Sequence, residues 1–272
     1  MAMSINTNVG AMIALQNLNR SNAELEKTQL HITTGLRING PKDDASTYAI
    51  AQRMRGDIAG MQAVKTALAA GESTVNVAIT AGKAISEMLT EMKAKVVQAN
   101  QAGLDTDSSN ALHDDFTALR DQIETIIATA EFNGKNLITS GASNLTVLST
   151  VDGSTITVTA QVLDTTTMVI STSALTDATV AATALTQIDN AINSVTTALA
   201  SLGSSGKRID VQTDFTTQLV DILKEGVGNL VDADLAEESA NLQALQIKQQ
   251  LGVQALSIAN AGPQSILSLF NG

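Results

Sequence analysis

The sequence contains no cysteine, no tryptophan and only two prolines. Without cysteine the chain can form no disulfide and can offer no thiolate as a nucleophile or metal ligand. Because proline breaks helices, its scarcity permits long ones. Aromatic residues make up only 2% of the 272 residues, although hydrophobic residues make up 44%. Small aliphatic side chains suit close-packed helices in a thin bundle, whereas a compact core normally uses aromatic bulk.

Positive charge is also scarce, since 16 basic residues stand against 27 acidic residues and the net charge is −11. An acidic chain has no electrostatic reason to bind nucleic acid or an anionic membrane, so we expect neither partner. No apolar run approaches the roughly 20 residues that a membrane-spanning helix needs. The first charged side chain is Arg20, so the N-terminus lacks the basic segment of a secretory signal. We therefore expect either a cytoplasmic protein or export without a cleaved signal.

The two ends of the chain lack charge altogether. Neither residues 1–19 nor residues 249–272 contain a charged side chain, and their polar positions are mainly Asn, Gln, Ser and Thr. An isolated surface helix normally keeps charge on its solvent face. The ends are therefore predicted to be amphipathic helices buried on most of their circumference by other molecules. The alternative is that they simply pack on the rest of their own chain.

Long helices are predicted from seven-residue repeats in both halves of the chain. The first terminal helix should end at Gly35, and Asp43 and Asp44 should cap the long helix that follows. Residues at the repeat positions are predicted to form the coiled-coil core: Met54, Met61, Leu68, Val75, Ile85, Leu89, Val96, Leu185, Ile188, Ile192, Val195, Leu199 and Leu202.

The middle of the chain, from about residue 132 to 176, changes from helical to two-residue periodicity. Ile156, Val158, Ala160 and Val162 alternate with polar residues, and Asn133-Gly134 is a turn signal. One or two β-hairpins are predicted here, and helix should resume near Asp177. The fold is therefore predicted to be mainly α, with long antiparallel coiled-coil helices and a small central β-hairpin region. The predicted domains are residues 1–40, 41–180, 181–231 and 232–272.

Catalytic and metal-binding patterns are weak. His113, Asp114 and Asp115 are consecutive, so on a helix they point in different directions and cannot readily converge on a metal. His31 lies beside the apolar face of the first helix and is predicted to be an interface residue. Residues 203–207 superficially resemble a phosphate loop, but position 201 is Ser and the segment lies within a helical repeat. We predict no enzymatic activity, no cofactor and no metal.

Several motifs at both ends resemble those of bacterial flagellins. In the N-terminal part these are Ser4-Ile5-Asn6-Thr7-Asn8, Leu15-Gln16-Asn17-Leu18, Thr34-Gly35-Leu36-Arg37-Ile38-Asn39, Ala49-Ile50-Ala51-Gln52-Arg53-Met54 and Glu131-Phe132-Asn133-Gly134-Lys135. In the C-terminal part they are Ile188-Asp189, Leu202-Gly203, Asp232-Ala233-Asp234, Gln249-Gln250, Ala259-Asn260 and Pro263-Gln264. The resemblance covers about residues 1–139 and 180–272, with only a short segment between.

This resemblance implies a structural subunit that polymerises into the flagellar filament, with a flagellin-like D0/D1 architecture. The terminal helices would form the inner tube and the coiled-coil helices the outer tube. The implied partners are other copies of the chain, an export chaperone that binds the C-terminal region, a filament cap protein and hook-junction proteins. The implied location is the extracellular filament, reached through the flagellar type III export apparatus. A hook–filament junction protein and a soluble coiled-coil adaptor remain the alternatives.

Residues of the terminal helices are predicted to form the self-assembly interface: Ile5, Val9, Met12, Leu15, Leu18, Leu25, Leu242, Leu245, Leu251, Leu256, Ile258, Ile266 and Leu269. Residues 91–98 correspond to the segment that the animal Toll-like flagellin receptor recognises. Glu91 stands where an arginine is usual and Lys95 where a leucine is usual, so weak or no recognition is predicted. The exposed Ser and Thr residues of 140–186 are predicted to be O-glycosylation sites.

Overall fold

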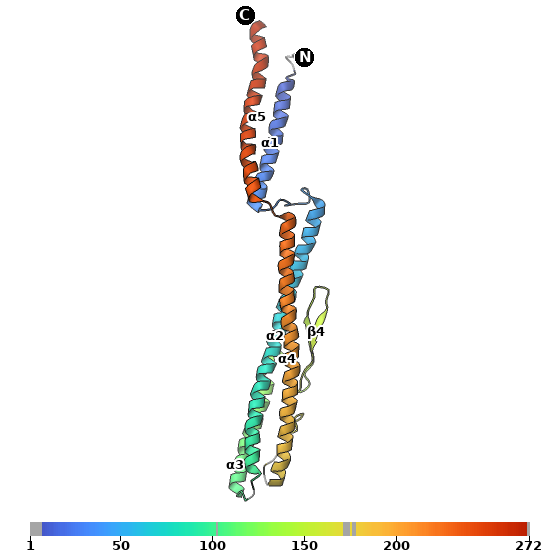
Figure 1. The fold of residues 1–272 in the computed structure, drawn as a ribbon, viewed down its shortest axis with the longest axis vertical. Helices are drawn as coiled ribbons and strands as arrows, with labels where there is room; N and C mark the ends of the chain where they lie inside the picture. The colour runs from blue at the N-terminus through green and yellow to red at the C-terminus, as the bar shows by residue number, and fades with distance from the viewer. Residues whose placement is uncertain (1–6, 102, 171–174, 176–177, 271–272) are drawn as a thin grey trace. The chain divides into compact units, whose positions relative to one another are not determined.

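The computed structural model is mainly helical, with two small antiparallel hairpins (Figure 1). This confirms the predicted fold class. The structure describes residues 7–101, 103–170, 175 and 178–270, with side chains to residue 261. The chain divides into two compact units: a terminal unit, residues 1–56 and 222–272, and a central unit, residues 57–221. The predicted domain boundaries at 40, 180 and 231 stay a prediction.

The terminal unit contains helices α1 (Val9–Thr34) and α5 (Leu235–Phe270), which lie side by side and run in opposite directions (Figure 1). The Asn8 side chain caps α1 by accepting a 3.0 Å hydrogen bond from the Ala11 N–H. Gly35 ends the helix with φ 71°, a left-handed conformation that glycine adopts without steric cost. The predicted helix end at Gly35 is therefore confirmed.

Two connecting segments pair with each other within the terminal unit. Leu36 forms a β-bridge with Asp232, and the Ala233 N–H donates a 2.9 Å hydrogen bond to the Gly35 carbonyl. The Arg37 N–H similarly donates to the Val231 carbonyl at 2.7 Å. These bonds tie the end of α1 to the start of α5, so both helices leave from one point.

The central unit contains helix α3 (Thr106–Thr129) and most of α2 (Ala45–Ala99) and α4 (Ala178–Val231). Helices α2 and α4 lie side by side and are antiparallel (Figure 1). They approach closely where one of them has glycine: a Cβ at Gly82 would lie 2.9 Å from Leu199 Cδ2. Helix α3 adds Phe116, Ile123 and Ile127 to the same core. Asp177 lies outside the described residues, and the first described helical residue after it is Ala178.

The hairpins are β1 (Glu131–Phe132) with β2 (Lys135–Asn136), and β3 (Leu145–Leu148) with β4 (Thr155–Val158). Leu145 pairs with Val158 and Leu148 with Thr155. The prediction of alternating strand residues holds for Ile156 and Val158, which are buried, but is wrong for Ala160 and Val162, which lie beyond β4. After Val158 the chain leaves the hairpin, because the Gln161 N–H donates instead to the Leu137 carbonyl at 2.8 Å.

Within the described part of the chain, no helix is long and apolar enough to span a membrane.

Candidate self-assembly surface

The contact between α1 and α5 follows a heptad pattern that becomes visible in the burial of their side chains. Every third or fourth residue is wholly or partly buried, which is the spacing of a coiled-coil seam. The seam residues of α1 are Ala11, Ala14, Leu18, Ser21, Leu25, Thr28 and Ile32, and those of α5 are Glu238, Leu242, Leu245, Gln249, Gly252, Leu256 and Ala259. Gly252 permits the closest approach, since a Cβ there would lie 3.2 Å from Leu18 Cδ1.

Polar contacts across this seam fix how the two helices are aligned. His31 Nδ1 lies 2.7 Å from Glu238 Oε1, and both side chains are largely buried. The Gln249 side-chain amide donates a 2.8 Å hydrogen bond to Asn22 Oδ1. Because a buried polar group that loses its partner costs free energy, a shift of one helix along the other is disfavoured.

The opposite sides of both helices carry large apolar side chains that the seam leaves exposed. We call this set the outer stripe: Val9, Met12, Ile13, Ile247, Leu251 and Ile258. Val9 lies nine residues before Leu18, or about two and a half turns, and so on the far side of α1 from the seam. Ile258 is 75% exposed, the largest value in the outer stripe. An exposed apolar stripe, most of which lies in the uncharged residues 1–19 and 249–272, indicates a surface that other molecules cover.

The structure places the residues predicted for the interface in three different environments. Val9, Met12, Leu15, Leu251 and Ile258 are exposed; Leu18, Leu25, Leu242 and Leu256 are half-buried in the seam; and Leu245 is buried there. Ile5 and the side chains of Ile266 and Leu269 lie outside the described residues. Ile13 and Ile247 were not among the predicted interface residues. Once the seam positions are known, their spacing from those positions shows that they face outward.

The residues predicted for the coiled-coil core also fall into groups. The structure buries Leu68, Val75, Ile85, Leu89, Val96, Ile188, Val195 and Leu202, and half-buries Leu185, Ile192 and Leu199 against them. Met61 is half-buried in the central unit. Met54 belongs to the terminal unit, where its Cε lies 3.0 Å from the position of a Cβ on Gly226.

The loop before α2 is held by two carboxylates with different roles. Asp44 accepts hydrogen bonds from the Thr47 N–H and hydroxyl, which lower the pKa of its carboxyl and cap the helix as predicted. Asp43 instead accepts bonds from the Asn39 and Gly40 N–H groups, at 3.1 and 3.2 Å, and pairs with Lys27 at 3.5 Å. The hydrogen bond from the Asn39 N–H is the largest cause of a lowered pKa for the Asp43 carboxyl, and the contacts with Gly40 and Lys27 lower that pKa further. Asp43 therefore orders the loop and does not cap α2.

The polar clusters that were considered for chemistry have structural roles. His113 accepts a 3.4 Å hydrogen bond at Nδ1 from the Leu175 N–H. Residues 203–207 lie inside α4 and form no phosphate-binding loop. Among the described residues, no group of three or more potential ligands is placed to hold a metal ion.

The fold and the outer stripe define a class of protein: a coiled-coil structural subunit with exposed apolar side chains on its terminal helices. Residues 5–143 match the family model described as the bacterial flagellin N-terminal helical region, and residues 185–270 match that of the C-terminal helical region. The chain belongs to the bacterial flagellin family. Members of this family are structural subunits of the flagellar filament, so the chain is a homopolymer-forming subunit that serves motility. Its homologues form the extracellular filament.

Relatives in several bacteria match along the whole chain. Flagellin FljN of Caulobacter vibrioides is 50% identical over 268 residues, which cover 98% of both chains. A flagellin of Brucella melitensis is 40% identical over 282 residues, covering 99% of each. Among solved structures, a putative flagellar hook-associated protein from Vibrio parahaemolyticus has a TM-score of 0.59 and 16% identity, covering 70% of this chain and all of that one. At this identity the likeness shows the fold alone.

Proposed function

We propose that the outer stripe is the surface through which the terminal helices of neighbouring copies pack in the filament. The observation that supports this is its exposure: six large apolar side chains lie on α1 and α5, facing away from their mutual seam, and five of them fall within the uncharged residues 1–19 and 249–272. Burying one Val, Leu, Ile or Met side chain contributes about 1.5–3 kcal/mol. Several such burials per subunit are enough to drive association without any ion pair, which suits chain ends that carry no charged side chain.

The seam between α1 and α5 serves a different role in this proposal. It aligns the two helices within one copy, so that each helix presents its stripe residues on the side away from the other helix. Small seam residues, such as Ala14 and Gly252, bury little apolar surface, so the isolated pair is weakly stabilised. The terminal helices are then the least stable part of the monomer and fold fully when other copies cover the stripe.

Export and capping follow from the same surface. An exposed apolar face is an aggregation hazard before assembly, so a chaperone that covers the C-terminal helix would be required in the cytoplasm. The subunit would then be secreted through the flagellar export apparatus, fold under the cap protein and adjoin hook-junction proteins at the filament base. We assign it no enzymatic activity. The filament role is favoured over the hook–filament junction because both family matches are to flagellin.

Recognition by the animal flagellin receptor should be weak or absent. Glu91 is exposed on α2, and the Lys95 Nζ lies 2.6 Å from Asp115 Oδ2 on α3. An ion pair occupies a place where an apolar contact would be needed, and burying it under a receptor would require desolvating both charges. A full reporter-cell response to purified monomer would contradict this proposal.

O-linked glycans are proposed on the exposed hydroxyl groups of the hairpin β3–β4. Thr146, Thr155 and Thr157 are exposed there, whereas Ser149 and Thr165 are buried and are excluded as acceptors. Intact-mass measurement of native filaments should show an excess over the sequence mass, and a mass equal to that of the sequence would remove this proposal.

The proposed function is tested by assembling the purified full-length chain on short filament seeds and imaging the products by electron microscopy. Long filaments at micromolar concentration are expected. Counting copies per organelle separates the alternative, because a junction protein would be present in few copies and a filament subunit in thousands.

A further inference from the structure

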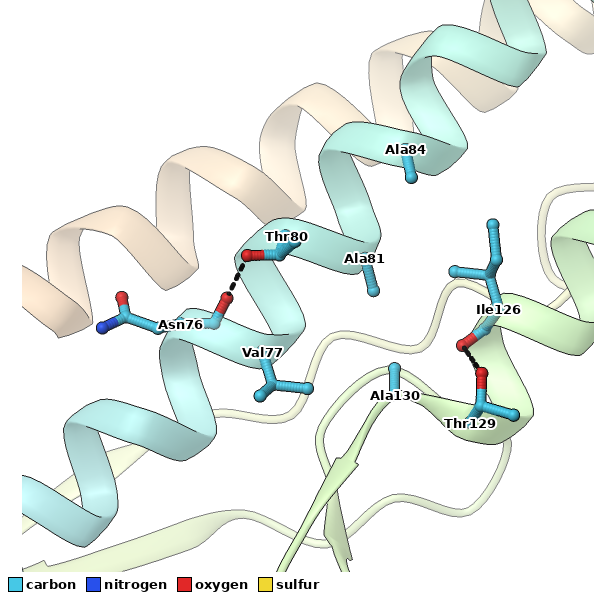
Figure 2. Close-up of a pocket in the computed structure, with 8 residues that line it drawn as sticks. All are labelled: Asn76, Val77, Thr80, Ala81, Ala84, Ile126, Thr129 and Ala130. Atoms are coloured by element: carbon cyan, nitrogen blue, oxygen red, sulfur yellow. Dashed lines mark hydrogen bonds between the residues drawn. The ribbon is translucent and has the colours of Figure 1, made fainter.

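An apolar groove lies between α2 and α3 in the central unit (Figure 2). It has a volume of about 440 Å³ and is lined by Asn76, Val77, Thr80, Ala81, Ala84, Ile126, Thr129 and Ala130. None of these eight residues is charged, although the chain as a whole carries a net charge of −11. Like-charged copies repel one another, so contacts between copies are favoured where charge is absent.

The two hydroxyl groups of the groove need no external partner, and Figure 2 shows the Asn76 side chain pointing away from Ile126 and Ala130. The Thr80 hydroxyl donates a 2.8 Å hydrogen bond to the Asn76 carbonyl, and the Thr129 hydroxyl donates to the Thr125 carbonyl at 2.8 Å. Figure 2 shows the side chains of Val77 and Ala81 on the side of α2 that faces Ile126 and Ala130. The groove therefore suits an apolar side chain, which could enter without leaving an unpaired donor or acceptor.

An apolar ridge stands elsewhere on the same unit. Phe215 on α4 is 57% exposed, with Val211 one turn before it and Val151 of the β3–β4 turn beside it. Aromatic residues make up only 2% of the chain, and Phe215 leaves more than half of its side chain in solvent. We call Val151, Val211 and Phe215 the ridge. Exposed Phe and Val side chains gathered at one point indicate a contact surface.

Groove and ridge lie on different sides of the unit and at different heights along it. The β3–β4 hairpin, which carries Val151, packs on α2 at Gly71. Ala84 of the groove lies thirteen residues further along α2. At about 100° per residue, the hairpin and the groove therefore lie about 140° apart around the α2 axis. Phe215 is level with Val64, since both line one pocket, whereas Thr80 is sixteen residues further along α2. At 1.5 Å per residue, the ridge and the groove are offset by roughly 24 Å.

We propose that the ridge of one copy inserts into the α2–α3 groove of a neighbouring copy, which is displaced along the helix direction by about that offset. The proposal rests on the self-assembly proposed above and names the surfaces that the central units use. Because the two surfaces differ and are staggered, the contact is heterologous and does not close, which is the geometry that an open helical polymer requires.

Charge supports the alignment that this docking imposes. All copies in a helical polymer share one polarity, so α4 of one copy runs antiparallel to α2 of the next. With Phe215 opposite Thr80, Val211 lies opposite Ala84, and Arg208 lies opposite Glu87. Arg208 and Glu87 are both exposed, and neither makes an ion pair within the described part of its own chain. Opposite charges therefore meet at the edge of the proposed contact.

The absence of cysteine allows a direct test by disulfide trapping. A chain with both Val211→Cys and Ala84→Cys is assembled under reducing conditions and then oxidised. Because the two positions lie in different surfaces, crosslinks should join more than two copies and give a ladder of oligomers in denaturing gels. The matched control is Val211→Cys with Val77→Cys, which keeps the face of α2 but moves the thiol by one heptad, or about 10 Å, too far for a disulfide.

Filaments that form without the ladder, or with equal ladders in both chains, would overturn the ridge–groove contact while leaving the proposed function intact. Failure of the unmodified chain to polymerise would instead refute the proposed function. If the cysteine variants do not assemble, hydroxyl-radical footprinting of the unmodified chain decides the matter. Oxidation of Phe215 should fall at least fivefold on assembly, and equal oxidation in monomer and filament would refute the proposal.

A charge exchange tests the alignment independently. Arg208→Glu should raise the critical concentration for assembly about threefold, since like charges then meet, and adding Glu87→Arg in the same chain should restore it. A double variant that assembles no better than Arg208→Glu alone would contradict the proposed alignment.

Discussion

Replacing Ile258 with Asn should weaken assembly and leave the subunit itself unchanged. Ile258 is 75% exposed on α5, so about three quarters of its burial energy is still available to a neighbouring copy. Full burial of an isoleucine contributes about 1.5–3 kcal/mol, which leaves about 1–2 kcal/mol to be gained in the filament. At 1.4 kcal/mol per factor of ten, Ile258→Asn should raise the critical concentration roughly 5- to 30-fold.

The assay is seeded assembly followed by sedimentation, with the critical concentration read from the protein that stays in solution. Unfolding of the soluble subunit in urea, followed by circular dichroism, should shift by less than about 0.5 kcal/mol, as for other exposed positions. The control is Ser257→Asn, which introduces the same side chain at the preceding exposed, polar position and should change the critical concentration less than about twofold. Equal critical concentrations for Ile258→Asn and the unmodified chain would refute the assignment of the outer stripe.

Three further predictions concern the folding of the subunit. Leu89→Ala should lower the free energy of unfolding of the central unit by about 2–5 kcal/mol in urea titrations, because Leu89 is fully buried in its core. Gly71→Ala should lower the free energy of unfolding by about 1–3 kcal/mol, although alanine favours a helix more than glycine does, because the added Cβ would lie 2.5 Å from Val147 Cγ2. Hydrogen exchange should then be faster in β3–β4. Gly56→Ala, with open space around it, is the control and should be neutral or stabilising. Asp44→Ala should lower the melting temperature at pH 7. The folded-state pKa of Asp44 lies below its ordinary value of 3.8, so the stability that the Asp44 carboxylate contributes is present above pH 3.8 and is lost as the pH falls through the folded-state pKa. At that low pH the melting temperatures of Asp44→Ala and the unmodified chain should converge.

The long helices of the central unit could be predicted because their signal is local and repeated. Leu68, Val75, Leu89 and Val96 keep one phase along α2, and any partner helix must meet that face. The contribution of α3 was harder to assign. Leu112, Phe116, Leu119 and Ile123 have helical spacing, but nothing in that spacing shows that Phe116 enters the same core as α2 and α4.

Strand ends could not be predicted from alternation alone. Residues 156–162 alternate throughout, yet β4 ends at Val158, because the following backbone finds hydrogen-bond acceptors at Leu137 and Ile138. Such pairing joins segments more than twenty residues apart. It depends on how the hairpins lie on the helices, which period-two patterning does not encode.

The interface residues illustrate a further limit. Lack of charge correctly drew attention to both ends, but it could not separate residues that face the partner helix from residues that face outward. That separation depends on the alignment of α1 with α5, which contacts such as His31 with Glu238 fix across 207 residues of sequence. Once the alignment is known, Leu245 belongs to the seam and Ile258 to the outer stripe, although both are apolar residues of one helix.

The most direct test of the central claim is electron microscopy of truncated chains. Variants that lack residues 1–20 or 250–272 lose part of the outer stripe but keep α2, α3 and α4 intact. The proposal predicts that neither variant forms filaments on seeds, while circular dichroism shows that the remaining helices still unfold cooperatively. Filaments of normal length from either truncated chain would contradict the claim that the terminal helices hold the polymer together.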